Sequence, residues 1–267
     1  MSERQHRASD GVRLVYDDVG PQGGPVVVLC HGLAATGEQF AADAEYFAGL
    51  GYRVLVPDLR GHGRSDAPMP VVAAAFSIEQ LARDLIGMLD DAGVAGVHWV
   101  GNSLGGIVAL EMLAAGRFRS LVTFGTLYSI RLPQIGGHRL IAAGHRLIGR
   151  DAAAALTART TTRDPAARTL VQKMLHQVRP EVTATLAGVL TRYDLIAKGS
   201  AATLPILMLR GSEDRMVNAG LAPTLAAMRG RPNFELVDLP GGGHCANLDA
   251  RDAFRKAVLA FWTRSSA

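Results

Sequence analysis

The clearest indication of the fold lies at residues 97–105, Val97-His98-Trp99-Val100-Gly101-Asn102-Ser103-Leu104-Gly105. It opens with an apolar run typical of a buried strand, and the apolar residues at 107–113 that follow it indicate a helix. Between the two lies Ser103, with a glycine two positions to either side. At so sharp a turn, larger side chains would collide with neighbouring backbone, and glycine avoids that collision. The sequence therefore predicts strand, tight turn and helix, with the serine hydroxyl exposed above the strand end.

A serine hydroxyl is a weak nucleophile at neutral pH, so this interpretation requires a general base and an acid that orients it. His244 follows three glycines and a predicted strand at 234–239, which places it on a late loop at the edge of the sheet. Asp214 follows the predicted strand at 204–210. The chain order is then serine, aspartate, histidine, with Ser103 first.

Five blocks in this order have a counterpart in a known family: His31-Gly32-Leu33, the nine residues from Asp58 to Asp66 (DLRGHGRSD), the turn around Ser103, Gly211-Ser212-Glu213-Asp214, and Gly243-His244. On these blocks the chain resembles the α/β-hydrolase superfamily from about residue 12 to residue 262. The DLRGHGRSD block and a small helical cap are most similar to the carboxylesterase, enol-lactonase and cofactor-free haloperoxidase branch.

The resemblance implies a role for each site residue. Ser103 would attack a carbonyl carbon, His244 would take and return its proton, and Asp214 would hold the imidazole in the useful tautomer. The backbone N–H groups of Leu33 and Leu104 would form the oxyanion hole. The resemblance implies no cofactor and no metal ion.

Glu213 competes with Asp214 for the role of the acid because the two are adjacent. We prefer Asp214, since the family pattern places the acid at that position of the loop after the strand. The family's other location for the acid follows the predicted strand at 120–125, where Thr126 and Leu127 offer no carboxylate.

Other histidines and both cysteines have structural interpretations. The resemblance implies that His31 and His62 bond to loop backbones, and His98 lies inside a predicted strand. The spacing of Cys30 and Cys245 fits no metal-binding motif. We expect them to be reduced and buried as small hydrophobic residues, with a disulfide between neighbouring loops as the alternative.

Strand-like runs alternate with helical stretches, which predicts an α/β fold with a mostly parallel central sheet flanked by helices. We expect strands near 12–18, 25–30, 52–57, 96–101, 120–125, 204–210 and 234–239, and helices near 38–49, 77–92, 104–115, 219–229 and 250–263. Ser77 and Gln80 predict a capping box, and Gly51 and Gly93 predict helix ends.

The alternation breaks between Tyr128 and Thr203, where helices are expected at 138–156, 165–178 and 181–197. The resembled family inserts a helical cap at this place, so the resemblance implies a hydrolase core at 1–127 and 204–267 and an inserted helical cap at 128–203. The cap carries nine Arg and two Lys against four carboxylates, a net charge of +7 in a chain of +4. We favour a solvated basic face; attraction of an anionic substrate or of an acidic surface is the alternative. Aromatic residues are too few there to indicate nucleic-acid binding.

The serine argues against haloalkane dehalogenases and epoxide hydrolases, which resemble this fold but place an aspartate at the turn. We expect hydrolysis of a small or medium carboxylic ester or lactone. The alternatives are a carbon–carbon bond hydrolase of a dienoic keto acid and a ligand receptor with little turnover. Residues 1–7 are charged and precede no apolar segment, so we expect no secretory signal, no membrane span and a cytoplasmic protein. A homo-oligomer is left open.

Overall fold

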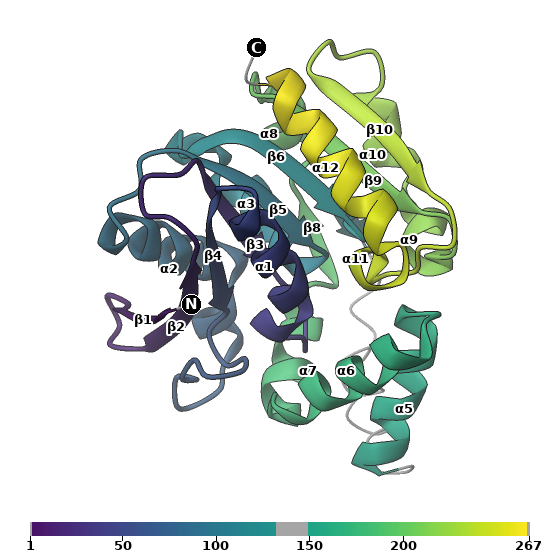
Figure 1. Ribbon diagram of the computed structural model, residues 1–267. Coiled ribbons are helices and arrows are strands. Elements are labelled where there is room, and N and C mark those ends of the chain that lie inside the picture. Colours follow the sequence, from purple (N-terminus) through teal and green to yellow (C-terminus); the bar gives the residue numbers. More distant parts are fainter. Residues whose placement is uncertain (1, 132–148, 266–267) are drawn as a thin grey trace.

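The computed structural model describes residues 2–131 and 149–265. Within them, one sheet of eight strands has the order β1-β2-β4-β3-β5-β6-β9-β10. In this sheet the neighbouring strands are parallel from β4 to β10, whereas β1 pairs antiparallel with β2 and β2 pairs antiparallel with β4. The predicted α/β fold with a mostly parallel sheet is confirmed (Figure 1).

All seven predicted strands are present, with ends within two residues of those expected. They are β2 (Arg13–Val19), β3 (Val26–Cys30), β4 (Arg53–Asp58), β5 (Val97–Asn102), β6 (Phe118–Phe124), β9 (Ile206–Gly211) and β10 (Phe234–Leu239). The strand β1 (Ser2–Arg7) was not predicted, because its residues are mostly exposed and polar and it forms by pairing with the edge of β2.

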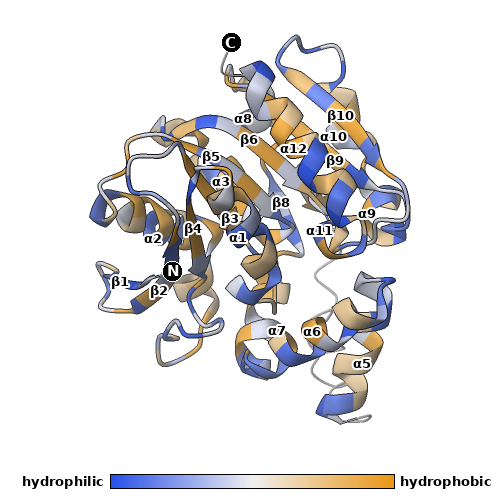
Figure 2. Cartoon of the chain, viewed as in Figure 1, coloured by the Kyte–Doolittle hydropathy of each residue, from blue (hydrophilic) through white to orange (hydrophobic). Residues whose placement is uncertain are grey.

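Helices cover both faces of the sheet (Figure 1). On one face lie α1 (Ala41–Gly49) and α12 (Arg251–Ser265), and on the other lie α2 (Ile78–Asp91), α3 (Leu104–Met112), α8 (Ile196–Ala201) and α10 (Ala222–Met228). Successive side chains of β5 face opposite sides of the sheet and pack against the two helical layers. Trp99 packs with α2 and α3, and Val100 packs with α1 and α12. The inner strands are accordingly coloured mainly as hydrophobic in Figure 2.

The helix ends agree in part with the sequence signals. The Ser77 hydroxyl accepts from the Gln80 N–H, but the Gln80 side chain donates to Asp84, so only half of the predicted capping box forms. Gly51 and Gly93 both have positive φ, at +93° and +67°, as expected for helix ends.

Other predicted helices differ in detail. The helix at 38–49 begins with a 3-10 turn, η1 (Gly37–Phe40), and the helix at 104–115 ends with another, η3 (Leu113–Ala115). The helix expected at 219–229 is two helices, α9 (Arg215–Gly220) and α10, because Pro223 favours the first turn of a new helix. The short elements η2 (Ala73–Phe76) and α11 (Ala246–Asp249) precede α2 and α12.

Helices α5 (Arg150–Thr161), α6 (Pro165–His176) and α7 (Pro180–Val189) form a separate group beside the sheet (Figure 1). The predicted helix at 165–178 is α6, whereas part of the one at 138–156 lies outside the described residues. The prediction of one helix over 181–197 is wrong beyond Val189, where α7 ends. There β8 (Arg192–Asp194) pairs with β7 (Ser129–Arg131), and this pairing outweighs local helix propensity.

The DLRGHGRSD block is held by buried ion pairs. The Arg60 side chain is fully buried, and its Nε and Nη2 donate to the two carboxylate oxygens of Asp84 on α2, at 2.5 and 2.6 Å. It also donates to Asp10 at 2.9 Å and to the Ala75 carbonyl at 2.8 Å. The loop after β4 is thereby fixed to α2 and to the β1–β2 connection.

Asp84→Ala should lower the free energy of unfolding by about 3–5 kcal/mol, because it leaves the buried Arg60 guanidinium without its bidentate partner. Asp10→Ala should cost about 1 kcal/mol or less, because that carboxylate is 38% exposed and its pair is screened. Urea unfolding of both variants measures the difference. Equal losses would contradict the assignment of Asp84 as the main partner.

Candidate active site

Ser103 lies at the sharp turn between β5 and α3. Its φ is +49° and its ψ is −112°, a conformation that non-glycine residues rarely adopt. A Cβ at Gly101 would lie 2.5 Å from the Gly105 carbonyl carbon, and one at Gly105 would lie 2.2 Å from the Cys30 carbonyl oxygen. Both positions therefore require glycine, for the steric reason expected from the sequence.

The loop that carries Leu33 lies against the Ser103 turn. A Cβ added at Gly32 would lie 3.2 Å from the Ser103 Cβ and 3.0 Å from the Asn102 Oδ1. Leu104 is the first residue of α3, so its N–H has no partner within the helix. No hydrogen bond from the N–H of Leu33 or Leu104 is found among the described residues. The Leu104 N–H and the loop that carries Leu33 thus lie next to Ser103, and neither N–H donates a hydrogen bond within the described part of the chain.

Two buried histidines hold this loop in place. The His31 Nε2 accepts from the Leu59 N–H at 3.0 Å, and the His62 Nε2 accepts from the Ala34 N–H at 3.2 Å. Each ring places its Nδ1 within 3.0 Å of a backbone carbonyl, to which it donates in the neutral tautomer. The structural interpretation of His31 and His62 is confirmed.

Burial keeps both rings neutral. It lowers the pKa of His31, and together with the adjacent His31 ring it lowers the pKa of His62 to about 3. An unprotonated Nε2 accepts a hydrogen bond, whereas an imidazolium has no nitrogen that can accept one. The backbone around Ala34, which has a φ of +57°, therefore depends on an uncharged His62.

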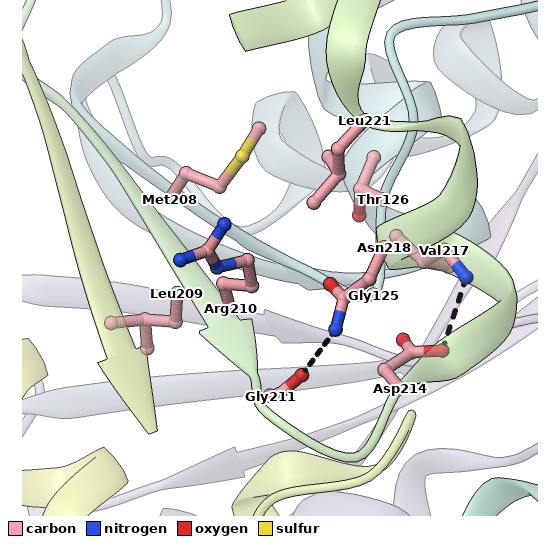
Figure 3. Close-up of a pocket in the computed structure, with 10 residues that line it drawn as sticks. All are labelled: Gly125, Thr126, Met208, Leu209, Arg210, Gly211, Asp214, Val217, Asn218 and Leu221. Atoms are coloured by element: carbon pink, nitrogen blue, oxygen red, sulfur yellow. Dashed lines mark hydrogen bonds between the residues drawn. The ribbon is translucent and has the colours of Figure 1, made fainter. Parts of the chain in front are cut away.

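The structure brings Asp214 and His244 together. The Asp214 Oδ2 lies 2.9 Å from the His244 Nδ1, and its Oδ1 accepts from the Val217 N–H at the start of α9. Figure 3 shows this carboxylate in a small pocket between the end of β6 and α9. Glu213 instead points to the surface, where its partner is Arg163 at 3.4 Å.

His244 reaches the serine turn through Asn102. The Asn102 Nδ2 donates to the His244 carbonyl at 2.9 Å, and the Ser103 N–H donates to the Phe124 carbonyl at 2.9 Å. The imidazole packs on Gly125, where an added Cβ would lie 3.0 Å from its Nδ1. The loops after β5, β9 and β10 thus bring the three predicted residues to one edge of the sheet, around the end of β6.

Asn102 and the buried amides behind it are further site residues that no sequence pattern predicted. The Gln39 Nε2 donates to the Asn102 Oδ1 at 3.0 Å and to the Asn247 Oδ1 at 3.2 Å. Asn247 in turn donates to Asp43, which is paired with Arg255. Asn102 lies within the turn motif, but at the position where the motif allows any residue, and Gln39 and Asn247 belong to no motif.

The remaining predicted residues have structural roles. The His98 Nδ1 lies 2.8 Å from the Ser120 hydroxyl, and burial lowers the pKa of His98 to about 4. Cys30 and Cys245 are free, buried and part of two hydrophobic clusters. Burial raises the pKa of both thiols, that of Cys245 to about 12, so neither is an activated nucleophile.

The described residues contain no group of three or more His, Cys, Asp or Glu side chains placed to hold a metal ion. Of the helices within 2–131 and 149–265, none combines the length and apolar character that a membrane crossing requires.

A family model described as the alpha/beta hydrolase family matches residues 27–257. The chain belongs to this family, and it is a hydrolase by that membership.

Two relatives illustrate the range of activities. The chain is 29% identical to the protein named as carbamate hydrolase RutD in Variovorax paradoxus, over 95% of this chain and 97% of that one. It is 39% identical to epoxide hydrolase A of Mycobacterium tuberculosis, but only over 38% of this chain and 30% of that protein. The second match therefore covers less than a third of the relative.

Solved structures of similar fold include two ester-cleaving enzymes. The enol-lactonase of Burkholderia xenovorans superposes with a TM-score of 0.83 at 26% identity, covering 97% of this chain and 100% of that one. The esterase RhEst1 of a Rhodococcus species gives a TM-score of 0.83 at 25% identity, covering 98% of each chain.

The neutral His62 makes stability depend on pH. The unfolded chain protonates this imidazole below its ordinary pKa of 6.5, but the folded chain does so only near 3. The free energy of unfolding should therefore fall as the pH drops from 6.5 towards 3, by up to about 1.4 kcal/mol per pH unit from this group. In His62→Gln, an amide oxygen can still accept from Ala34 and nothing titrates, so the dependence should be shallower. Urea unfolding from pH 7 to about pH 4 compares the two; parallel curves would contradict the role of His62.

Proposed function

We propose that the chain is a serine hydrolase that cleaves small or medium carboxylic esters or lactones through an acyl-serine intermediate. The observation that carries this proposal is the placement of Ser103 at a strained turn, beside the free N–H of Leu104 and the Leu33 loop, with the His244–Asp214 pair held at the same sheet edge.

The chemistry follows from these positions. His244 accepts the Ser103 proton as the hydroxyl oxygen attacks the carbonyl carbon, and the N–H groups of Leu33 and Leu104 stabilise the negative oxygen of the tetrahedral intermediate. The imidazolium returns the proton to the leaving alcohol, which departs as the acyl-serine forms. Water, deprotonated by His244, then releases the acid and restores Ser103. Asp214 accepts the Nδ1–H throughout and stabilises the imidazolium.

The ester or lactone class is supported by the nucleophile and by the relatives. A serine forms acyl esters, whereas the aspartate expected at this turn in epoxide hydrolases displaces at carbon. The enol-lactonase and the esterase share the fold over nearly the whole chain. The carbamate hydrolase relative makes carbamates a further acyl substrate to include in a screen.

We further propose that 128–203 is a cap that selects the substrate, with the core at 1–127 and 204–267. Hydrophobic residues of α5 and α6 pack against Ala35, next to the Leu33 loop, and against Cys245, next to His244. The group α5–α7 is thus seated beside the proposed catalytic residues, where it would restrict access to Ser103.

Ser103→Ala should lower kcat for a short-chain p-nitrophenyl ester by about 10⁴- to 10⁶-fold, because no other hydroxyl replaces the nucleophile. The free energy of unfolding should change by about 1 kcal/mol or less. Stopped-flow ester hydrolysis and urea unfolding measure the two quantities. Wild-type turnover in this variant would contradict the assignment of Ser103 as the nucleophile. A folded wild-type chain that is inactive on esters, lactones and carbamates would contradict the proposed substrate class.

Asp214→Asn should lower kcat by about 10⁴-fold, because the amide favours the wrong imidazole tautomer. Glu213→Gln is the matched control, the same change one residue away at a side chain that points outward, and should retain kcat within about threefold, since an exposed charge contributes little. Steady-state kinetics on one ester compares them. The reverse order of losses would make Glu213 the acid.

A further inference from the structure

The turn between α5 and α6 contacts the His244 loop on both sides of the histidine. The Thr161 carbonyl accepts from the Cys245 N–H at 3.0 Å. A Cβ at Gly243 would lie 2.9 Å from the same carbonyl oxygen. Thr162 is almost fully buried at this contact. The helical group and the loop of the proposed base are therefore in close backbone contact.

The Asp249 carboxylate joins these two segments. Its Oδ2 accepts from the Gly243 N–H at 2.9 Å, on the residue before the histidine. Its Oδ1 accepts from the Thr162 hydroxyl, from the Arg163 N–H at 2.8 Å and from the Asp164 N–H at 3.0 Å. One carboxylate thus bonds to the loop of the base with one oxygen and to the α5–α6 turn with the other.

We propose that Asp249 is a positioning residue that couples the α5–α6 turn to His244. Its carboxylate fixes the backbone at Gly243, and this holds the imidazole of His244 against Asp214. The inference rests on the proposed function, because it assigns Asp249 to the same site. The residue contacts no substrate in this assignment and acts through His244.

A carboxylate is the group that this position needs. An ionised Asp accepts at both oxygens, so it satisfies donors on two opposite sides, and hydrogen bonds to a charged acceptor are stronger than neutral ones. An asparagine accepts on one side only. If its oxygen faces Thr162, its NH₂ group faces the Gly243 N–H, and donor meets donor.

The apolar contacts behind the turn support the same coupling. Ala158 of α5 with Val171 and Met174 of α6 packs against Ala35 and Cys245 in one hydrophobic cluster. These contacts hold the turn near the loop without setting its register. The directional bonds of Asp249 set the register, because a hydrogen bond weakens steeply when it bends.

Asp249→Asn should lower kcat for p-nitrophenyl acetate by about 10- to 100-fold, since small displacements of a catalytic base cost this much. KM should stay within about twofold of the wild-type value, because so small an ester would make few contacts with the proposed cap. The low-field proton NMR resonance of the His244 Nδ1–H, hydrogen-bonded to Asp214, should broaden or disappear through exchange with water. Circular dichroism should remain that of the wild type.

Asp252→Asn is the matched control. Asp252 is exposed in the first turn of α12, three positions further along, and the same change of charge there should leave kcat and the resonance as they are in the wild type. Thr162→Val removes one bond on the turn side and should cause a loss of about two- to fivefold, consistent with one hydrogen bond. It should add nothing in an Asp249→Ala background.

Wild-type kcat and an unchanged resonance in Asp249→Asn would overturn the coupling, as would equal losses in Asp252→Asn. The NMR measurement needs no turnover, so it distinguishes two failures. In one case the wild-type chain cleaves no ester but shows the resonance, and Asp249→Asn loses it. That result would contradict the proposed function and support the positioning role of Asp249. A wild-type chain that cleaves esters, with a resonance that is unchanged in Asp249→Asn, would retain the proposed function and contradict the positioning role of Asp249.

Discussion

The close approach of the β5–α3 turn to the end of β3 is the constraint on which the site depends. The Gly105 Cα faces the Cys30 carbonyl so closely that no side chain fits between them. This contact forces α3 to start directly above the sheet and holds Ser103 at positive φ. It also sets the Leu104 N–H beside the loop that follows β3. One packing contact thus places the proposed nucleophile next to the N–H groups proposed for the oxyanion hole.

The loops around this turn are fixed mostly through backbone atoms. His31 and His62 hold the Leu33 loop by accepting N–H bonds, Asn102 holds the His244 carbonyl, and Asp249 holds the Gly243 N–H. Buried side chains with paired polar groups specify a single arrangement more strongly than apolar contacts do. Neutral imidazoles suit this purpose because burying a charge would cost far more than burying a hydrogen-bonded ring.

The sequence predicts the features that local sterics and chain order determine. The inner strands are long apolar runs, and the glycines around Ser103 follow from a steric rule, so both were found. The edge strand β1 was missed because its stability comes from pairing with β2, which no local pattern records. The helix expected to run to residue 197 ends at Val189 for the same kind of reason.

The prediction of the site shows the same division. The order of Ser103, Asp214 and His244 along the chain can be read directly, and the last two are within hydrogen-bond distance. The positioning side chains cannot be read, because their partners are remote: Asn102 is 142 residues from His244, and Asp249 is 87 from Thr162. Polar residues of this kind look like ordinary loop residues until the fold brings them together.

A crystal structure of the protein after reaction with an alkyl phosphonate would locate the nucleophile and the oxyanion hole together. We expect phosphorus bonded to the Ser103 Oγ, with the phosphoryl oxygen within hydrogen-bond distance of the N–H groups of Leu33 and Leu104. An adduct on another residue, or a phosphoryl oxygen directed away from both N–H groups, would contradict it.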